Sequence, residues 1–187
     1  MAYDARSESQ RLIREGLPDR PVRLSRRHRF APVSVDVASD AAATWFVRRG
    51  VGCFWDEIHL LVREPVGWRL LGGGGGSSGG PWSTDEFDRA RGGLPAGGFE
   101  LTGGSSVVRD KGSWLPLGSR WIRSSMLLVG PSVAEAVIAG RHRPVPYHGR
   151  LVVVWSSRRP PLVSLRDGVG SELSTVAPGD TYRGRRS

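Results

Sequence analysis

The run of glycines and serines that follows WRLL resembles two short patterns of catalytic chemistry. GGGSSG (74–79) matches the dinucleotide pattern G-x-G-x-x-G, and GGSSG (75–79) matches the nucleophile pattern G-x-S-x-G with Ser77 as the nucleophile. The first pattern needs a helix that starts inside it, and the second needs a strained strand-to-helix turn. Further glycine and a proline come before any helix, so we predict that residues 72–82 form a flexible surface loop.

Two histidines, His142 and His148, lie six residues apart in RHRPVPYHG. They could ligate zinc or a similar ion if a third ligand such as His59 or Asp56 came close. They also follow Ser77 in the chain order of an α/β-hydrolase. The segment is more typical of a rigid proline-rich turn with solvated histidines, so we predict no metal and no other cofactor.

The segment WDEIH (55–59) combines carboxylate and imidazole side chains. In a strand, alternation puts Glu57 and His59 on one face and Asp56 on the other, together with the apolar residues that follow. A carboxylate beside an imidazole could carry out general acid–base chemistry. The pattern is more typical of a polar sheet face on which Glu57 lies opposite an arginine of a neighbouring strand.

Basic residues are concentrated at the ends of the chain. The net charge is +9, and the first 30 residues carry eight arginines against four acidic residues. An extended arginine-rich arm could neutralise phosphates in a manner independent of nucleic-acid sequence. No recognised nucleic-acid-binding module accompanies it. The arginines of the arm that we consider candidates are Arg20, Arg23, Arg26, Arg27 and Arg29.

The chain contains seven tryptophans, which is many for 187 residues. Most are expected to fill a core between sheets. Trp82 and Trp114 lie in glycine-flanked segments that resemble loops. We therefore expect these two, if any, to be exposed for interaction with a partner.

Alternating apolar residues from Phe30 onward predict an all-β fold. Turn residues punctuate the strand patterns, and the capping box of Ser83 with Glu86 and the stop at Gly92 predict one short helix. Helix-length crossovers are absent, which favours antiparallel pairing. The expected strands lie at 33–39, 44–49, 56–64, 67–72, 98–102, 105–110, 121–129, 133–139, 150–155 and 161–166.

These elements predict an antiparallel immunoglobulin-like sandwich or a partly open barrel. Its expected parts are a basic N-terminal arm at 1–29 with a marginal helix, a β-sandwich domain at 30–173 and a disordered tail at 174–187. The two ends are expected to be basic and partly disordered.

No convergent catalytic set is visible, so we predict a non-enzymatic binding or accessory module. A single cysteine, Cys53, and the lack of a long apolar segment indicate a reducing, cytoplasmic location without a membrane span. The expected partner is another protein, bound through sheet edges or the loops around 72–82 and 111–121. A nucleic-acid-associated protein that uses the arm is the first alternative, and a metal-dependent or serine hydrolase is the second.

Overall fold

The computed structural model describes residues 3–19, 23–78, 84–109 and 121–179. These residues form a mostly β fold with two helices, and all strand pairings are antiparallel. The helices are α1 (Ala5–Glu15) and α2 (Thr84–Gly92). The strands are β1 (Phe30–Ala38), β2 (Ala41–Arg49), β3 (Phe54–Glu64), β4 (Gly67–Ser78), β5 (Phe99–Val108), β6 (Trp121–Val129), β7 (Glu135–Ile138), β8 (Arg141–Pro144), β9 (Arg150–Trp155), β10 (Val163–Arg166) and β11 (Glu172–Val176).

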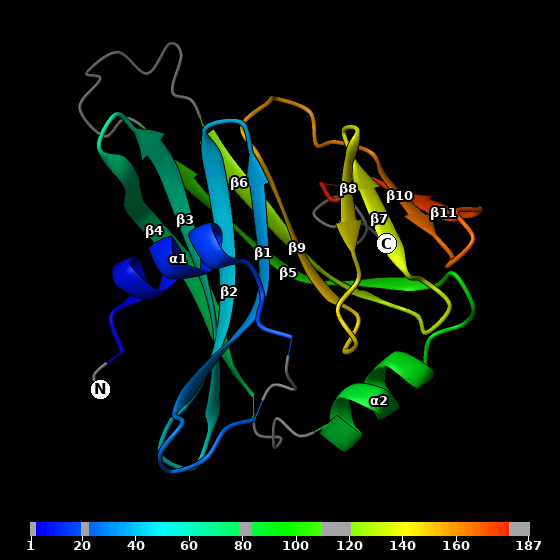
Figure 1. Cartoon of the computed structure of the whole chain (residues 1–187), viewed down its shortest axis with the longest axis horizontal. Helices are drawn as coiled ribbons and strands as arrows, with labels where there is room; N and C mark the ends of the chain where they lie inside the picture. Colours follow the sequence, from blue (N-terminus) through cyan, green and yellow to red (C-terminus); the bar gives the residue numbers. More distant parts are fainter. Residues whose placement is uncertain (1–2, 20–22, 79–83, 110–120, 180–187) are drawn as a thin grey trace, which may run out of the picture.

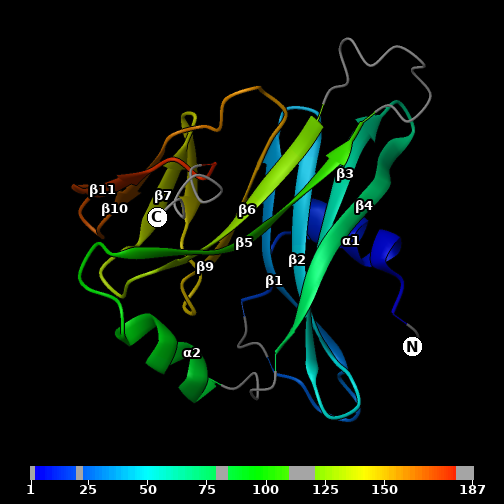
Figure 2. The same cartoon turned by 180° about the vertical axis from the view of Figure 1, so that it is seen from behind.

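The strands form three sheets, and the described strands do not close into a barrel (Figure 1). We call them sheet A (β1-β2-β3-β4), sheet B (β5-β6-β9) and sheet C (β11-β10-β7-β8). Consecutive hairpins build sheet A, and the turn expected between the strands at 56–64 and 67–72 is confirmed, because Glu64 pairs with Gly67. Helix α2 lies at one end of the sheets and connects sheet A to sheet B (Figure 2).

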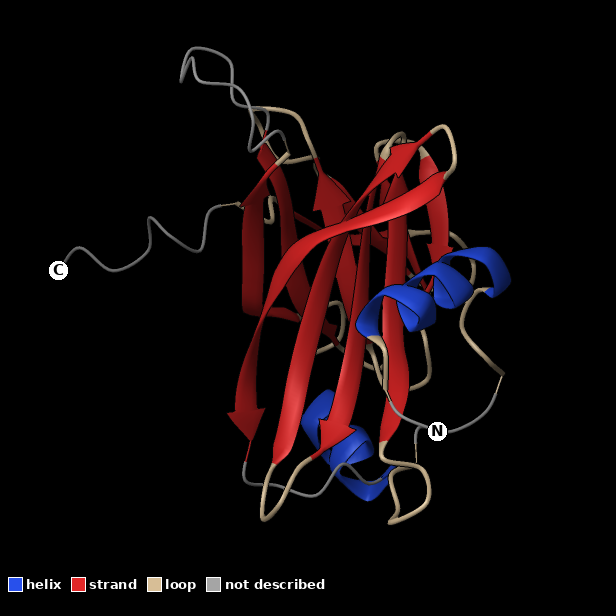
Figure 3. Cartoon of the chain, turned by 90° about the vertical axis from the view of Figure 1, so that its left-hand side faces the viewer, coloured by secondary structure: helices blue, strands red, loops and turns tan. Residues whose placement is uncertain are grey.

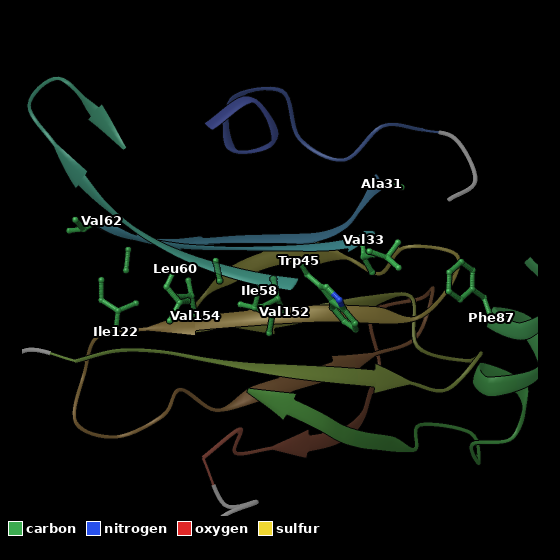
Figure 4. Packing of buried hydrophobic residues seen from close by; sticks show 13 residues of the cluster. Ala31, Val33, Trp45, Ile58, Leu60, Val62, Phe87, Ile122, Val152 and Val154 are labelled. Atoms are coloured by element: carbon green, nitrogen blue, oxygen red, sulfur yellow. The ribbon is translucent and has the colours of Figure 1, made fainter. Parts of the chain in front are cut away.

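Sheet B lies between sheets A and C. The fold therefore has three layers of sheet, whereas a sandwich of two layers was expected. Val152 and Val154 of β9 pack with the inner face of sheet A (Figure 4), while Leu151 and Val153 pack with sheet C. The uninterrupted apolar run LVVVW at 151–155 is the sequence signature of a strand buried on both faces. The antiparallel all-β character is confirmed, whereas the immunoglobulin-like arrangement is not.

Side chains of β1, rather than a backbone ladder, join sheet A to the edge of β9. The amide of Val152 donates to Ser34 Oγ and that of Val154 to Asp36 Oδ2, both at 2.9 Å. The same carboxylate pairs with Arg141 of β8, whose Nη2 lies 3.3 Å from Oδ2. Asp36 therefore contacts all three sheets, with a side chain only 1% exposed.

Helix α1 lies across the outer face of sheet A (Figure 3). Asp4 caps its N-terminus, and Leu12 is buried against Phe46. Ser9 shares a buried 2.7 Å hydrogen bond with Thr44 of β2. These contacts with the sheet explain why a helix with few apolar residues forms here.

Two predicted segments are wrong in part. Residues 72–78 are not a loop, because they form the second half of β4 and pair with β3. Residues 174–176 are not a disordered tail, because they belong to β11 and Val176 is buried. The rest of the predicted loop, from residue 79, and the chain from residue 180 onward lie outside the described residues.

Candidate ligand-binding cavity

The glycines of β4 replace side chains that would otherwise fill the space between sheets A and B. In the register of β3 with β4, Gly74 pairs with Ile58 and Gly76 pairs with Asp56. Directly paired residues share a face of the sheet. Ile58 is 2% exposed and faces the core between the sheets, so Gly74 and Gly76 face it too.

Strands β4 and β5 lie close together at Gly72 and Gly74, and the gap between them opens at Gly76. A Cβ atom on Gly72 would lie 3.4 Å from Val107 Cγ1, and one on Gly74 would lie 3.1 Å from Ser105 Oγ. A Cβ atom on Gly76 would meet no atom of the described residues within 4 Å. The two strands therefore approach each other most closely at Gly74 and leave open space at Gly76.

This open space is an open cavity of about 650 Å³ between sheets A and B. Residues 74–77 of β4 and 102–104 of β5 form two of its walls. Phe87 of α2 and Met126 of β6 add an apolar surface. The volume falls in the range of pockets that hold small organic ligands.

Asp56 places a carboxylate on the core-facing side of β3. Its Oδ1 accepts a 2.8 Å hydrogen bond from Nε1 of Trp45, which is 2% exposed. Burial raises the pKa of Asp56, while the hydrogen bond from Trp45 and the charge of Arg150 act in the opposite direction. The cavity therefore contains a partly desolvated acceptor whose orientation is fixed by a buried indole.

Arg150 of β9 contributes a guanidinium to the same cavity. Its guanidinium carbon lies 4.7 Å from the centre of the Phe87 ring, in a cation–π contact. Burial lowers the pKa of Arg150, and the charges of Asp56 and Glu86 raise it. Sheet A thus presents an acceptor to the cavity, and sheet B presents donors.

The comparisons with known proteins give no guide to this cavity. No family model matches the chain, and neither curated proteins nor solved structures give a match. Among the described residues, no helix is long and apolar enough to cross a membrane. The chemistry of the cavity is therefore inferred from its own residues.

His148 is a buried structural residue that packs behind the cavity. Its Nδ1 accepts a 3.1 Å hydrogen bond from the Arg150 amide, and its ring lies 5.4 Å from that of Phe87. Burial, followed by the charges of Arg150 and Arg91, lowers the pKa of His148 to about 3. The imidazole is therefore neutral at ordinary pH.

The structure does not bring the two candidate metal ligands together. His142 is exposed and lies 3.0 Å from Glu135, whereas His148 is 2% exposed. The prediction that both histidines are solvated is therefore wrong for His148. Within the described ranges, no group of three or more His, Cys, Asp or Glu side chains could hold a metal ion.

Glu57 and His59 lie on the outer face of sheet A, away from the cavity. Arg48 of the neighbouring strand pairs with Glu57 at 2.7 Å, as the interpretation of a polar face predicts. His59 Nε2 lies 2.7 Å from the Tyr3 hydroxyl, beneath the segment that carries α1. Burial raises the pKa of Tyr3 and lowers that of His59, so this pair is a neutral hydrogen bond.

Ser77 lines the cavity but lies in an extended strand, where it pairs with Trp55. The strained turn of a nucleophile elbow is therefore not present at Ser77. The arm residues Arg23, Arg26, Arg27 and Arg29 are all exposed. Arg20, Trp82 and Trp114 lie outside the described residues.

The alternation in the sequence placed Asp56 on the same face as Ile58, but we did not recognise from it that Asp56 could belong to a functional site. A carboxylate on the core-facing side of a strand is expensive to bury and is a signal of function. Trp45 and Arg150 gave no such signal, because the hydrogen bond of Trp45 to Asp56 depends on the pairing of β2 with β3, and the electrostatic influence of Arg150 on Asp56 depends on the packing of sheet B. The glycines were interpreted as a loop because glycine is depleted in strands.

Proposed function

We propose that this chain is a binding protein that holds a small organic molecule in the cavity between sheets A and B. The observation that carries the proposal is the Asp56 carboxylate, which lies in a core-facing row beside glycines that leave the space open. A core built only for stability would fill this row with apolar side chains. The cavity is instead lined by apolar surface with a few polar groups, as ligand sites usually are.

Binding without catalysis is the function that these residues support best. The imidazole behind Phe87 is neutral and its Nδ1 accepts the Arg150 amide, so it is not a ready acid or base. Ser77 has no strained turn to activate it. Association with another protein through sheet edges, a cytoplasmic location and an immunoglobulin-like strand arrangement remain predictions.

Replacing Gly76 with valine should place a branched side chain in the cavity and obstruct ligand binding there without unfolding the protein. Within the part of the chain that the structure describes, the new Cβ meets no atom within 4 Å, and β-branched residues are favoured in strands. We expect the thermal midpoint to stay equal or rise, and the affinity for any compound bound at this site to fall by about tenfold or more. The measurement is ligand-observed NMR with a library of small polar compounds, followed by calorimetric titration of those that bind.

Gly168→Val is the matched control, since a Cβ at Gly168 also meets no atom within 4 Å and this turn does not line the cavity. Compounds that bind the cavity should bind the control as they bind the unmodified protein. If Gly76→Val binds every compound as well as the unmodified protein does, the cavity is not the ligand site.

A second candidate function is the association of the arm with nucleic acid. Arg23, Arg26, Arg27 and Arg29 are exposed, and none has a carboxylate partner among the described residues. Ser25 orders a turn in this segment, since its Oγ accepts the amides of Arg27 at 3.2 Å and His28 at 3.0 Å. Arginines without a described carboxylate partner beside an ordered turn favour the binding of a polyanion.

Changing these four arginines together to glutamine should lower the affinity for duplex DNA. It should also make that affinity less dependent on salt concentration. If each contacts one phosphate, the slope of log K against log salt concentration should become less negative by about 3 to 4. The double variant Arg158→Gln/Arg159→Gln, at another exposed site, should keep the original slope. Fluorescence anisotropy across a salt series measures the slope for both variants. An unchanged slope in the fourfold variant would show that these arginines do not bind DNA.

A further inference from the structure

The edge of β4 is open along the glycine-rich half of the strand. Among the described strands β4 pairs only with β3, so it forms one margin of sheet A (Figure 1). Residues 73–76 are exposed glycines, and the exposed surface of a glycine is main chain. The hydrogen bond of α1 to this strand lies near the start of β4, where Gln10 Nε2 donates to the carbonyl of Trp68. Residues 72–78 therefore present peptide N–H and C=O groups that can pair with a further strand.

Sheet edges in natural proteins are usually protected against such pairing. Charged side chains, prolines and β-bulges are common means of protection. The sequence of residues 72–78, GGGGGSS, contains no charge and no proline, and these residues pair with β3 without a register shift. The edge of β5 is different, because its register with β6 shifts between Leu101 and Gly103. Of these two edges, that of β4 is therefore the one suited to the addition of a strand.

The cavity lies directly inward of this edge. Its walls include residues 74–77 of β4 and 102–104 of β5, two strands at the margins of their sheets. Gly74 faces β5 across the space between the sheets, since a Cβ atom there would lie 3.1 Å from Ser105 Oγ. A strand that adds to β4 continues sheet A, and its side chains alternate between the two faces. Every second side chain therefore points toward the space between sheets A and B that contains the cavity.

We infer that β4 binds an extended peptide segment of another protein, which adds to sheet A as a strand along residues 72–78. An apolar side chain of the peptide enters the cavity and packs against the surface that Phe87 and Met126 provide. This inference rests on the proposed function, since that side chain fills the same cavity. It names the ligand as part of a protein partner and assigns the edge that holds the main chain of that partner.

A second copy of this chain fits the edge less well. Pairing of β4 with β4 of a second copy would bring two glycine-rich strands together, and glycine has no side chain to enter the cavity. The open space at Gly76 instead suits a strand with large side chains at alternate positions. A peptide segment that is not already part of a sheet can also adopt the register that brings such a side chain to the cavity.

The acetylated and amidated heptapeptide KTLTLTK is the probe, since it matches residues 72–78 in length and carries both leucines on one face. Calorimetric titration should show that it binds the unmodified protein. The same peptide with N-methylated threonines and leucines lacks most backbone donors and should bind about tenfold more weakly or worse. Alanine in place of both leucines should lower the affinity by a similar factor, because the cavity stays unfilled. Failure of KTLTLTK to bind, or equal affinity of the N-methylated peptide, would overturn the inference.

Amide hydrogen exchange, followed by NMR, locates the added strand. Amides of residues 72–78 that point away from β3 should exchange about tenfold more slowly or less when the peptide is bound, because they gain acceptors. Residues 99–104 of β5 should keep their exchange rates. Slower exchange in β5 rather than in β4 would overturn the assignment of the edge.

Gly76→Val and its control Gly168→Val separate this inference from the proposed function. The affinity for the peptide should fall by about tenfold in Gly76→Val, whose side chain takes the space of the anchor, and should be unchanged in Gly168→Val. If the peptide does not bind but small compounds bind and are lost in Gly76→Val, strand addition is wrong and the cavity remains a binding site. If neither peptide nor compound is sensitive to Gly76→Val, both proposals fall. A dimer in analytical ultracentrifugation whose β4 amides are protected without peptide would assign the edge to a second copy and overturn the inference.

Discussion

Replacing Asp36 with alanine is expected to lower the free energy of unfolding by about 3 kcal/mol, because removal of one partner strands the other groups of a buried ion pair. The carboxylate pairs with Arg141 and accepts the amide of Val154. Without it, the described residues offer that amide no acceptor, and they leave the guanidinium only its bond to the carbonyl of Val37. Since Arg141 is 29% exposed, water compensates part of the loss.

Urea unfolding at neutral pH measures this effect. The free energy of unfolding of Asp36→Asn should lie between those of Asp36→Ala and the unmodified protein, because the asparagine oxygen can still accept from the amide of Val154. Ser34→Ala removes one neutral hydrogen bond, to the amide of Val152, and should cost about 1 kcal/mol. If Asp36→Ala costs no more than Ser34→Ala, Asp36 does not hold the three sheets together.

Acidification should destabilise the protein through His148. In the folded state its pKa is about 3, whereas an unfolded histidine has a pKa near its ordinary value of 6.5. The unfolded chain therefore binds more protons between these values, and stability falls as the pH falls through this window. Between pH 8 and pH 5 this histidine should account for a loss of about 2 kcal/mol.

His148→Asn isolates this contribution. The asparagine oxygen can accept the Arg150 amide, but the side chain does not titrate. Urea unfolding at pH 8, 6.5 and 5 should show a shallower loss of stability in the variant than in the unmodified protein. Equal pH dependence of the two proteins would show that burial of His148 does not control acid stability. His59, whose pKa is also lowered, is present in both proteins and cancels in the comparison.

Local patterns in the sequence predicted much of the fold. Alternation in β3 placed Ile58, Leu60 and Val62 on one face, and all three are buried together. The turn after Glu64 and the helix that ends at Gly92 depend on nearby residues, so their signals are contained in short segments. The number of layers was missed, although two-sided burial of β9 is visible in its uninterrupted apolar run.

The cavity could not be predicted in the same way. The glycines from residue 72 have low strand propensity, and they become a strand only because β3 supplies a full ladder of partners. Gly75 shows how tightly the strands approach, since a Cβ there would lie 2.3 Å from the carbonyl oxygen of Asp56. Pairing with a distant segment, rather than local preference, decides this region.

The same dependence on distant partners applies to Asp36 and His148. In the sequence, VSVDV is an ordinary alternating strand, and nothing in it indicates that Asp36 pairs with an arginine more than a hundred residues away. His148 lies among prolines in a segment that resembles an exposed turn. Its burial follows from the packing of Phe87 and β9, which the local pattern does not encode.

The central position of sheet B has a consequence for the order in which the chain folds. Sheet A consists of consecutive hairpins, so its pairings form between residues close in sequence. The strand that covers its inner face, β9, lies more than a hundred residues beyond β1, as the bond between Ser34 and Val152 shows. On the ribosome, the apolar surface around Trp45 and Leu60 is therefore complete long before its cover has been synthesised. Contacts of such separation slow folding, and this interval is when the nascent chain is most exposed to aggregation.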